Sequence, residues 1–399
     1  MTIPLAHFIQ DSALPVDLVA GTLIGRVWDP SAKGPSPVVI RADGVFDLSG
    51  SHATVRDLLE SDDPVVAVRA SSGENLGDFH DIMANTPLES RDKTRPFFLA
   101  PIDLQAVKAA GVTFAASMIE RLIEERAHGV RKIAIDLRRE IAEEIGLDLA
   151  SIRPGSDKAV ELKTFLLARG MWSQYLEVGI GPDAEIFTKA ATLSAVGAGV
   201  PVGVLESSAW NNPEPEVVLV IDSQGRARGA TLGNDVNLRD VEGRSALLLP
   251  KAKDNNASCA IGPLVRLFDE TFSMESVRAM SVELEVTGPD GFTMHARSDM
   301  RQISRDPETL ITQLMGRHHQ YPDGVALMLG TLFAPTEDRG EAGGGFTHCR
   351  GDIVKIAAPE LGALVNPVEF SERCEPWTFG IAALMANLAR RGLLRKDAS

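Results

Sequence analysis

Three acidic side chains in the middle of the chain have a spacing suited to binding a metal ion. Glu214 and Glu216 open the segment 213–221, which reads Pro-Glu-Pro-Glu-Val-Val-Leu-Val-Ile. Side chains two residues apart on a strand point to the same face, so an extended conformation places both carboxylates together. The next residues, Asp-Ser-Gln-Gly, have the composition of a turn, after which the chain would run back and reach Asp235.

The position of this turn decides whether Asp235 joins the two glutamates. A turn centred on residues 223–224 would place Glu216 opposite Thr231. Directly opposed residues share a face of the sheet, so Asp235 would lie on the same face as Glu214 and Glu216. A slip of one residue would move it to the other face.

Three carboxylates on one face cannot all stay ionised without a compensating cation. A hard divalent ion with oxygen ligands is a natural partner, Mg²⁺ first, with Mn²⁺ or Ca²⁺ as alternatives. The competing interpretation is a solvated acidic hairpin, and the Glu-x-Glu spacing alone does not decide between the two.

The elements around this hairpin indicate an α+β protein, because runs of strands are separated from runs of helices. Residues 1–100 have the pattern of short strands, and residues 101–399 begin with helices and then become rich in strands. We expect an N-terminal domain over 1–100 and a catalytic domain over 101–399. The expected helices are 114–125, 133–145, 157–168, 262–272, 307–315 and 377–391, and the expected strands include 21–28, 37–41, 65–69, 216–221, 228–232, 246–250, 281–287, 292–297 and 353–356.

The charge and cysteine content exclude several classes of protein. The formal net charge is −15, which repels phosphate backbones and anionic lipid, so we expect neither nucleic acid nor a membrane as a partner. The three cysteines, Cys259, Cys349 and Cys374, have no paired spacing, which favours a reducing compartment. The N-terminal residues lack the pattern of a secretory signal, and we expect a cytoplasmic protein.

Several motifs, in a consistent order over roughly residues 110–370, resemble those of the fumarylacetoacetate hydrolase superfamily. Residues 233–240, Gly-Asn-Asp-Val-Asn-Leu-Arg-Asp, resemble its N-D-x-S-x-R-D signature. Residues 253–263 resemble its K-S-x-x-x-x-C-P-x-G-P segment, and the paired glutamates fall where the family has its metal ligands. Residues 329–331 and 351–366 resemble its G-T turn and its closing G-D…G-x-L-x-N pattern.

This resemblance implies a role for each matching residue. Glu214, Glu216 and Asp235 would be ligands of one Mg²⁺-like ion. Lys253 would be the active-site lysine and Thr331 a contact to the substrate carboxylate. Arg239 would orient a metal carboxylate or the substrate, although an ion pair with Asp235 four residues earlier is an equal alternative. Lys189 would neutralise the substrate, with a solvated lysine as the alternative.

The chain also departs from the hydrolytic members of the superfamily. Their N-Y-x-x-H-x-x-E motif corresponds here to residues 113–120, in which Glu120 is kept but Ser117 replaces the histidine. Serine is no general base near neutral pH without a partner, so activation of water for C–C hydrolysis is in doubt. This change, an altered G-T-P-x-G turn and the sequence of residues 374–380 are similar to the 2-keto-3-deoxypentonate dehydratase branch.

The resemblance therefore implies an α+β fold with a mixed β-roll catalytic domain and a smaller N-terminal domain. The implied function is Mg²⁺-dependent dehydration of 2-keto-3-deoxy-D-pentonate (xylonate or arabinonate) to 2,5-dioxopentanoate, also called α-ketoglutarate semialdehyde, through a metal-stabilised enolate. Lys253 would take the C3 proton and Glu120, held by Ser117, would protonate the leaving hydroxyl, or the reverse. A homodimer or higher homo-oligomer is expected.

Two other functions stay open at this stage. The first is a metal-dependent acylpyruvate or C–C bond hydrolase, or an oxaloacetate decarboxylase, using the same site. The second is a non-catalytic protein that binds a 2-oxo acid. Turnover of 2-keto-3-deoxyxylonate but not of an acylpyruvate would separate the first alternative from the dehydratase, and binding without turnover would favour the second.

Overall fold

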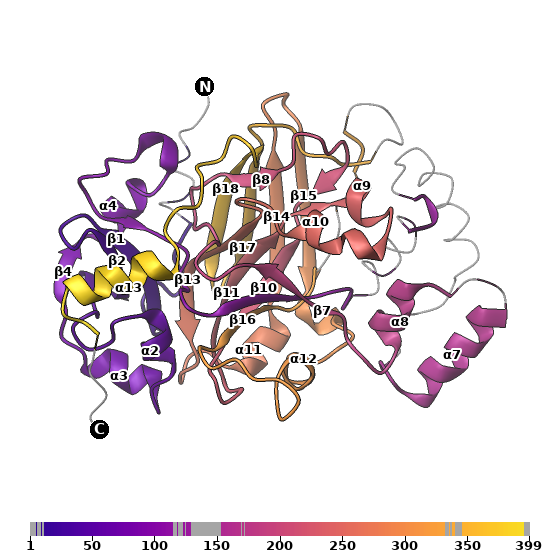
Figure 1. The fold of residues 1–399 in the computed structure, drawn as a ribbon, viewed down its shortest axis with the longest axis horizontal. Helices are drawn as coiled ribbons and strands as arrows, with labels where there is room; N and C mark the ends of the chain where they lie inside the picture. The colour runs from indigo at the N-terminus through magenta and orange to yellow at the C-terminus, as the bar shows by residue number, and fades with distance from the viewer. Residues whose placement is uncertain are drawn as a thin grey trace.

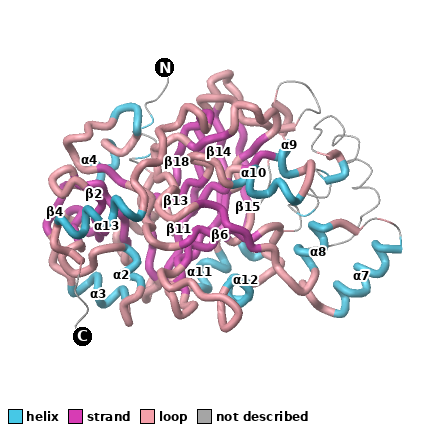
Figure 2. Tube along the Cα trace, viewed as in Figure 1, coloured by secondary structure: helices cyan, strands magenta, loops and turns pink. Residues whose placement is uncertain are grey.

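A large mixed sheet forms the centre of the molecule, and the helices lie around it (Figure 2). The computed structural model describes residues 5, 9, 12–114, 118, 123, 125–128, 153–168, 170, 172–331, 335, 337–339 and 345–394. Within these ranges, no helix has the length and apolar character needed to cross a membrane.

Within the described residues, the central sheet has 11 strands in the order β4-β3-β2-β1-β13-β11-β10-β16-β6-β7, with β5 paired to β1. Its middle strands β10, β11 and β13 are almost entirely buried, which explains the nearly continuous apolar sequences of β10 and β13. The strands are β1 (Leu23–Asp29), β2 (Gly34–Arg41), β3 (Gly44–Asp47), β4 (Glu74–Gly77), β5 (Phe97–Phe98), β6 (Ala106–Ala110), β7 (Ile186–Ala190), β10 (Pro215–Ile221), β11 (Ala227–Asp235), β13 (Cys259–Leu267) and β16 (Val325–Met328).

A second sheet of five strands has the order β15-β14-β17-β18-β8. Buried and exposed residues alternate along β14, as expected when one face of a sheet packs on the core and the other faces water. Leu284 and Ile356 of this sheet belong to the same hydrophobic cluster as Val217 and Leu232 of the central sheet. The strands are β8 (Val202–Val204), β14 (Ser281–Thr287), β15 (Thr293–Asp299), β17 (Ile353–Ala358) and β18 (Gly362–Phe370), and a separate pair is formed by β9 (Asn211–Asn212) and β12 (Asn237–Leu238).

The helices are short and lie at the periphery of the sheets (Figure 1). Helices α7 and α8 form one end of the molecule, and α13 lies at the other end beside the N-terminal strands. The α-helices are α2 (Val55–Leu59), α3 (Pro64–Ala70), α4 (Phe79–Ala84), α7 (Asp157–Ala168), α8 (Gln174–Ile180), α9 (Arg239–Glu242), α10 (Leu249–Lys253), α11 (Met274–Ala279), α12 (Pro307–Leu314) and α13 (Ile381–Arg390), and the 3₁₀ helices are η1 (Leu88–Ser90), η3 (Ala246–Leu248) and η4 (Met300–Gln302).

The predicted α+β class is confirmed, and several elements match their predicted bounds closely. Residues 157–168 and 307–314 are helices, and 281–287 is a strand. Of the predicted helix 114–125, the structure describes residues 118, 123 and 125 as helical. The predicted helix 133–145 lies outside the described residues.

Three predicted elements are wrong. Residues 65–69, predicted as a strand, belong to helix α3, because Asp63 caps the backbone and Pro64 occupies the first turn. Residues 246–250, also predicted as a strand, form η3 and the start of α10. Most of 262–272, predicted as a helix, continues strand β13, since an apolar run that is buried on every side has no periodicity to distinguish strand from helix.

The predicted division between residues 100 and 101 stays a prediction. Strand β1 pairs with β13, with Leu23 opposite Arg266 and Ile24 opposite Val265. The N-terminal strands therefore continue the central sheet.

Candidate metal and active site

The candidate metal site begins with the hairpin of β10 and β11. Glu216 lies opposite Gly233 and Pro215 opposite Asn234. The predicted partner of Glu216, Thr231, is therefore wrong by two residues. The difference arises because the turn is longer than predicted and the register shifts at Ile221. A shift of two residues keeps every side chain on its predicted face.

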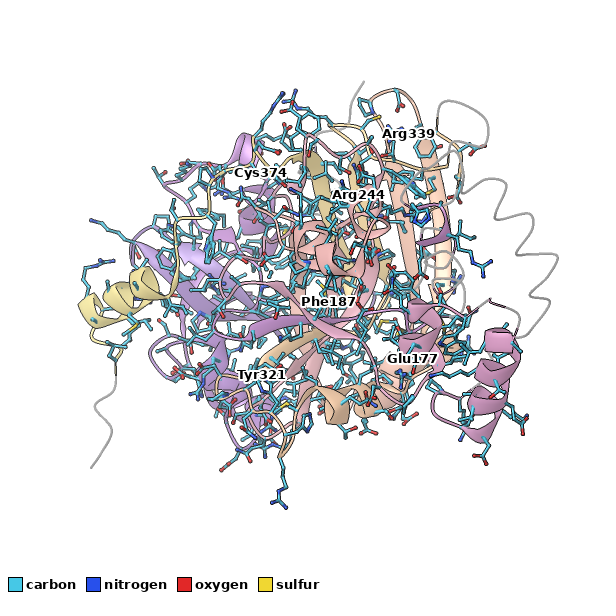
Figure 3. All side chains as sticks on the ribbon, turned by 45° about the vertical axis from the view of Figure 1, so that its right-hand side comes forward. Glu177, Phe187, Arg244, Tyr321, Arg339 and Cys374 are labelled. Carbon is cyan, nitrogen blue, oxygen red and sulfur yellow. The ribbon has the colours of Figure 1, made fainter. Side chains whose placement is uncertain are left out.

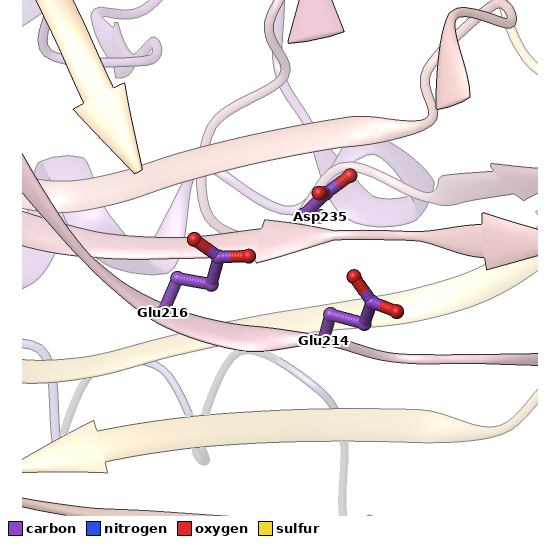
Figure 4. Close-up of side chains that lie close together, drawn as sticks. All are labelled: Glu214, Glu216 and Asp235. Carbon is purple, nitrogen blue, oxygen red and sulfur yellow. The ribbon is translucent and has the colours of Figure 1, made fainter. Parts of the chain in front are cut away.

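As predicted, the two glutamates and Asp235 share one face of this hairpin (Figure 4). Asp235 lies opposite Glu214, and its backbone N–H donates to the Glu214 carbonyl at 2.9 Å. The three carboxylates each offer one oxygen within 4.8 Å of the others. All three residues are at most 2% exposed, which rules out the alternative of a solvated acidic hairpin.

Glu216 has one satisfied and one unsatisfied carboxylate oxygen. Its Oε2 accepts a 2.7 Å hydrogen bond from the backbone N–H of Gly330. Its Oε1 is buried and has no hydrogen-bond partner within the described part of the chain. Burial, followed by the charges of Asp235 and Glu214, raises the pKa of Glu216 well above its ordinary value.

The turn that contacts Glu216 requires glycine. Gly330 has φ +99°, and a Cβ there would lie 2.0 Å from the Thr113 hydroxyl. That hydroxyl donates to the Leu329 carbonyl at 2.7 Å. The next residue, Thr331, is buried and lines the cavity beside the acidic cluster, where the resemblance predicted it.

Lys253 ends helix α10 and lies against the acidic cluster. Its Nζ is 2.6 Å from Glu214 Oε2 and 3.0 Å from Asp235 Oδ2, and it lies 5.6 Å from the centre of the Phe187 ring. The ammonium group thus occupies the space between two candidate metal ligands and also lines the cavity.

Lys189, which is fully buried in β7, approaches the cluster from the other side. Its Nζ is 2.8 Å from Asp235 Oδ1 and donates to the carbonyls of Val236 and Lys253. A register shift in the pairing of β6 with β7 falls at this residue, and such bulges re-aim a side chain. Lys189 directs its donors at protein groups, and its predicted contact to substrate stays a prediction.

Lys189 and Lys253 favour the ionised form of Asp235. Burial alone would raise its pKa, but the charges of Lys189 and Lys253 outweigh burial and hold the pKa below its ordinary value. Three carboxylates face two ammonium groups, so the cluster keeps a deficit of positive charge.

These properties fit a divalent cation. The cluster offers three oxygen donors of the kind that Mg²⁺ and similar ions prefer. Glu216 has a buried oxygen without a hydrogen-bond partner in the described part of the chain and a raised pKa. Both properties fit a carboxylate whose charge a bound cation would stabilise.

Arg239, another predicted site residue, is fully buried at the start of α9. Its Nε donates to Asn212 Oδ1 at 2.8 Å, and its guanidinium lies 5.6 Å from the centre of the Trp210 ring. These contacts hold the segment that follows Asp235. Ser117 and Glu120, the pair predicted to protonate the leaving hydroxyl, lie outside the described residues.

A cavity of about 10 Å³, enough for one water molecule, opens beside the cluster. Its wall includes three residues that the sequence analysis missed, Tyr175, Glu185 and Glu242. In Figure 3, Phe187, which also lines the cavity, is labelled near the middle of the molecule. Glu177, which belongs to the same helix as Tyr175, is labelled toward α7. Glu185 is two residues before Phe187 and four before Lys189, so strand periodicity could have found it.

Solved structures with this arrangement of elements exist. A 2-keto-3-deoxy-D-arabinonate dehydratase, solved in complex with magnesium and 2,5-dioxopentanoate, aligns over 87% of this chain and 99% of its own with a TM-score of 0.60 and 21% identity. A fumarylacetoacetate hydrolase from Exiguobacterium antarcticum aligns over 88% and 99%, with a TM-score of 0.52 and 16% identity.

The chain has the fumarylacetoacetate hydrolase fold. The fold class implied by the motifs is thereby confirmed. No family model matches the sequence.

Among proteins of this fold, the sequence resembles the pentonate dehydratase branch. It is 32% identical over 185 residues to a 2-dehydro-3-deoxy-D-arabinonate dehydratase of Saccharolobus solfataricus, covering 46% of this chain and 58% of that protein. It is 28% identical over 198 residues to a probable 2-keto-3-deoxyxylonate dehydratase of Haloferax volcanii, covering 50% and 64%. The chain thus matches somewhat under two thirds of the length of these relatives.

Proposed function

We propose that this protein is a divalent-metal-dependent dehydratase that converts 2-keto-3-deoxy-D-pentonate, the xylonate or arabinonate form, to 2,5-dioxopentanoate. The observation that carries the proposal is the buried cluster of Glu214, Glu216 and Asp235 with the Lys253 ammonium against it. The names of the sequence relatives support the reaction, and the magnesium in one structural neighbour supports Mg²⁺ as the ion.

Glu214, Glu216 and Asp235 would hold the ion. When bound, a divalent ion supplies Lewis-acid polarisation of a 2-oxo group. With Glu214 and Asp235 engaged in holding the ion, Lys253 would no longer be needed as their counter-charge.

Lys253 is our candidate for the group that takes a proton from C3 of the substrate. It lines the cavity and is 2% exposed, and its Nζ could accept this proton as the neutral amine. A base in this position acts on the carbon next to the 2-oxo group, where removal of a proton is easiest because the negative charge delocalises onto oxygen.

A carboxyl group must protonate the C4 hydroxyl as it leaves. Glu120 is the candidate from the motif, and Glu185 is a second candidate because it lines the cavity with Lys253. In sum, C3 loses a proton, the C4–O bond breaks, and water departs with the donated proton. Loss of a C5 proton and return of protons to carbon then give the terminal aldehyde, so the overall reaction removes one water.

Three further residues would position the substrate. Thr331 lines the cavity and would contact the substrate carboxylate. Lys189 and Arg239 are buried beside Asp235 and α9, and we propose that they act on the substrate through the residues they hold. A homodimer and a cytoplasmic location are also proposed, and light scattering of the purified protein would test the first.

Incubation of the purified protein with each 2-keto-3-deoxypentonate, with and without Mg²⁺, tests the function. Mass spectrometry is expected to detect loss of one water only when the ion is present. The same assay with an acylpyruvate and with oxaloacetate tests the hydrolase and decarboxylase alternatives. Metal-independent turnover, or cleavage of the acylpyruvate in place of dehydration, would refute the proposal.

A further inference from the structure

A second cavity, of about 230 Å³, lies where the C-terminal segment crosses from β18 to the N-terminal strands. In Figure 1 this segment joins β18 to α13 across the molecule. Among the described residues, the cavity shares no wall residue with the one at the acidic cluster. The proposed dehydration does not use it.

Arg26 of β1 forms part of the cavity wall and is only 6% exposed. One terminal nitrogen of its guanidinium donates to the carbonyls of Ala100 and Ile102. Its Nε is buried without a hydrogen-bond partner in the described part of the chain. Burial lowers the pKa of Arg26. The negative charge of Asp103 acts in the opposite direction, but the two side chains are not in contact.

A buried guanidinium without a contact ion pair is costly, because its desolvation is not repaid by a neighbouring anion. The carboxylate of Asp103 already accepts the backbone N–H groups of Val55, Arg56 and Leu104. Within the described residues, Arg26 forms no contact ion pair, so Asp103 compensates its charge only from a distance and the guanidinium could still pair with an anion in the cavity.

The other residues of the cavity wall indicate which kind of anion would fit beside Arg26. Arg91 adds a second guanidinium, stacked 4.1 Å from the centre of the Phe97 ring. Trp28, Trp377 and Phe379 supply aromatic surfaces, and Trp28 meets Phe379 edge to face at 5.4 Å. Glu375 also lines the cavity, but it is exposed and lies 3.7 Å from Lys93.

We propose that this cavity is a second ligand site, which binds a small planar organic carboxylate. The carboxylate would pair with Arg26, and the flat body would lie against the aromatic side chains. Aromatic residues give such a ligand a large contact area, and a guanidinium is the side chain best suited to a carboxylate.

The site also adjoins the loop that follows Lys253. Asn256 and Ala257 line the cavity, and the Asn256 amide donates to the carbonyls of Ser371 and Glu375. The Lys253 carbonyl accepts the Ser258 hydroxyl at 2.8 Å. A ligand in the cavity would therefore contact the same loop that fixes the end of α10.

Calorimetric titration of the chelator-treated full-length protein with benzoate tests the proposal. We expect a dissociation constant on the order of 1 mM or lower. Benzamide keeps the ring without the charge, and acetate keeps the charge without the ring, so each is expected to bind at least tenfold more weakly. Equal binding of benzoate and benzamide, or no heat from benzoate at tens of millimolar, would refute the site.

Variants locate the bound benzoate. Arg26→Gln should weaken binding at least tenfold, whereas Arg297→Gln, which changes an exposed arginine of β15, should leave it unchanged. If Arg26→Gln does not fold, Trp377→Ala serves instead, because Trp377 is 47% exposed and its loss should weaken binding several-fold without harming the core. Unchanged binding in Arg26→Gln, or in Trp377→Ala where that variant serves instead, would overturn the proposal.

Lys253→Met separates this site from the acidic cluster. If benzoate binds in the second cavity, its dissociation constant should be the same for Lys253→Met and for the original protein. Loss of benzoate binding in Lys253→Met would instead place the anion at the active site and refute the second site. This test does not depend on dehydratase activity.

Discussion

Lys253 Nζ donates a 2.6 Å hydrogen bond to Glu214 Oε2. The proposed base and a proposed metal ligand are therefore in direct contact, and each affects what the other can do. In the absence of metal, Lys253 supplies part of the positive charge that the ion would bring.

Lys253→Met is expected to reduce kcat by about 10²–10⁴-fold, the usual contribution of a positioned acid or base. Divalent-ion affinity should be retained or increased, because no ammonium group competes for Glu214. Steady-state kinetics and calorimetric titration with Mn²⁺ measure the two effects. Lys251→Met is the matched control, since Lys251 is exposed on the same helix. Substantial remaining turnover would exclude Lys253 as the base.

Glu216→Gln should separate stability from ion binding. The amide keeps an acceptor for the Gly330 N–H and removes a buried charge, so the metal-free variant should be more stable than the original protein by on the order of 1–3 kcal/mol. Mg²⁺ at 100 times Kd should increase the free energy of unfolding of the original protein by about 2.7 kcal/mol and so raise its Tm, and it should leave the variant unchanged. Differential scanning calorimetry measures both, and an equal Mg²⁺ response in the two proteins would exclude Glu216 as a ligand.

Lys189→Met tests whether this lysine is structural. Its Nζ contacts Asp235 and two carbonyls in a fully buried position, so its loss leaves buried groups without partners. We expect a loss of about 3–5 kcal/mol in the free energy of unfolding. Denaturant titration measures it. A stable variant with only a raised KM would instead show a direct contact to substrate.

Gly330→Ala tests the turn that holds Glu216. The new Cβ would meet the Thr113 hydroxyl, and the φ angle of +99° is strained for alanine. The expected loss of stability is about 1–3 kcal/mol, with weaker ion affinity. Gly291→Ala is the control, because Gly291 has φ +84° and open space around it. Equal effects of the two changes would mean that backbone strain alone is responsible.

The pH dependence of stability should contain a component from His348. This buried histidine lies 3.0 Å from Asp352, and burial lowers its pKa below 6.5. Protonation then favours the unfolded chain, so the stability it contributes is present above pH 6.5 and is lost as the pH falls through the lower folded-state pKa. His348→Asn, which can keep a donor to Asp352, should lack this component in unfolding curves measured at several pH values.

The acidic cluster could be predicted from sequence because strand periodicity fixes faces more firmly than partners. The prediction put Glu216 opposite Thr231, and the structure puts it opposite Gly233, yet the same face is presented. An error of two residues is harmless in a strand, whereas an error of one would have removed Asp235 from the cluster.

Residues that reach the site from distant segments were harder to predict. Tyr175 and Glu242 come from helices α8 and α9, whose positions depend on tertiary packing that no local pattern encodes. Strand β13 was predicted as a helix for the same reason, because its apolar sequence reflects neighbours on both sides. The motifs located Lys253, but its contacts with Glu214 and Asp235 needed the structure.

The pairing of β1 with β13 makes the first hundred residues a structural support for the strands that carry the candidate metal ligands. β13 is hydrogen-bonded on its other side to β11, where Cys259 lies opposite Asp235. A shortened chain starting at residue 101 would leave the main-chain groups of Val265 and Arg266 unpaired at a bare edge, one strand away from the acidic cluster. Such an edge can join that of another molecule, so we expect the truncated protein to self-associate.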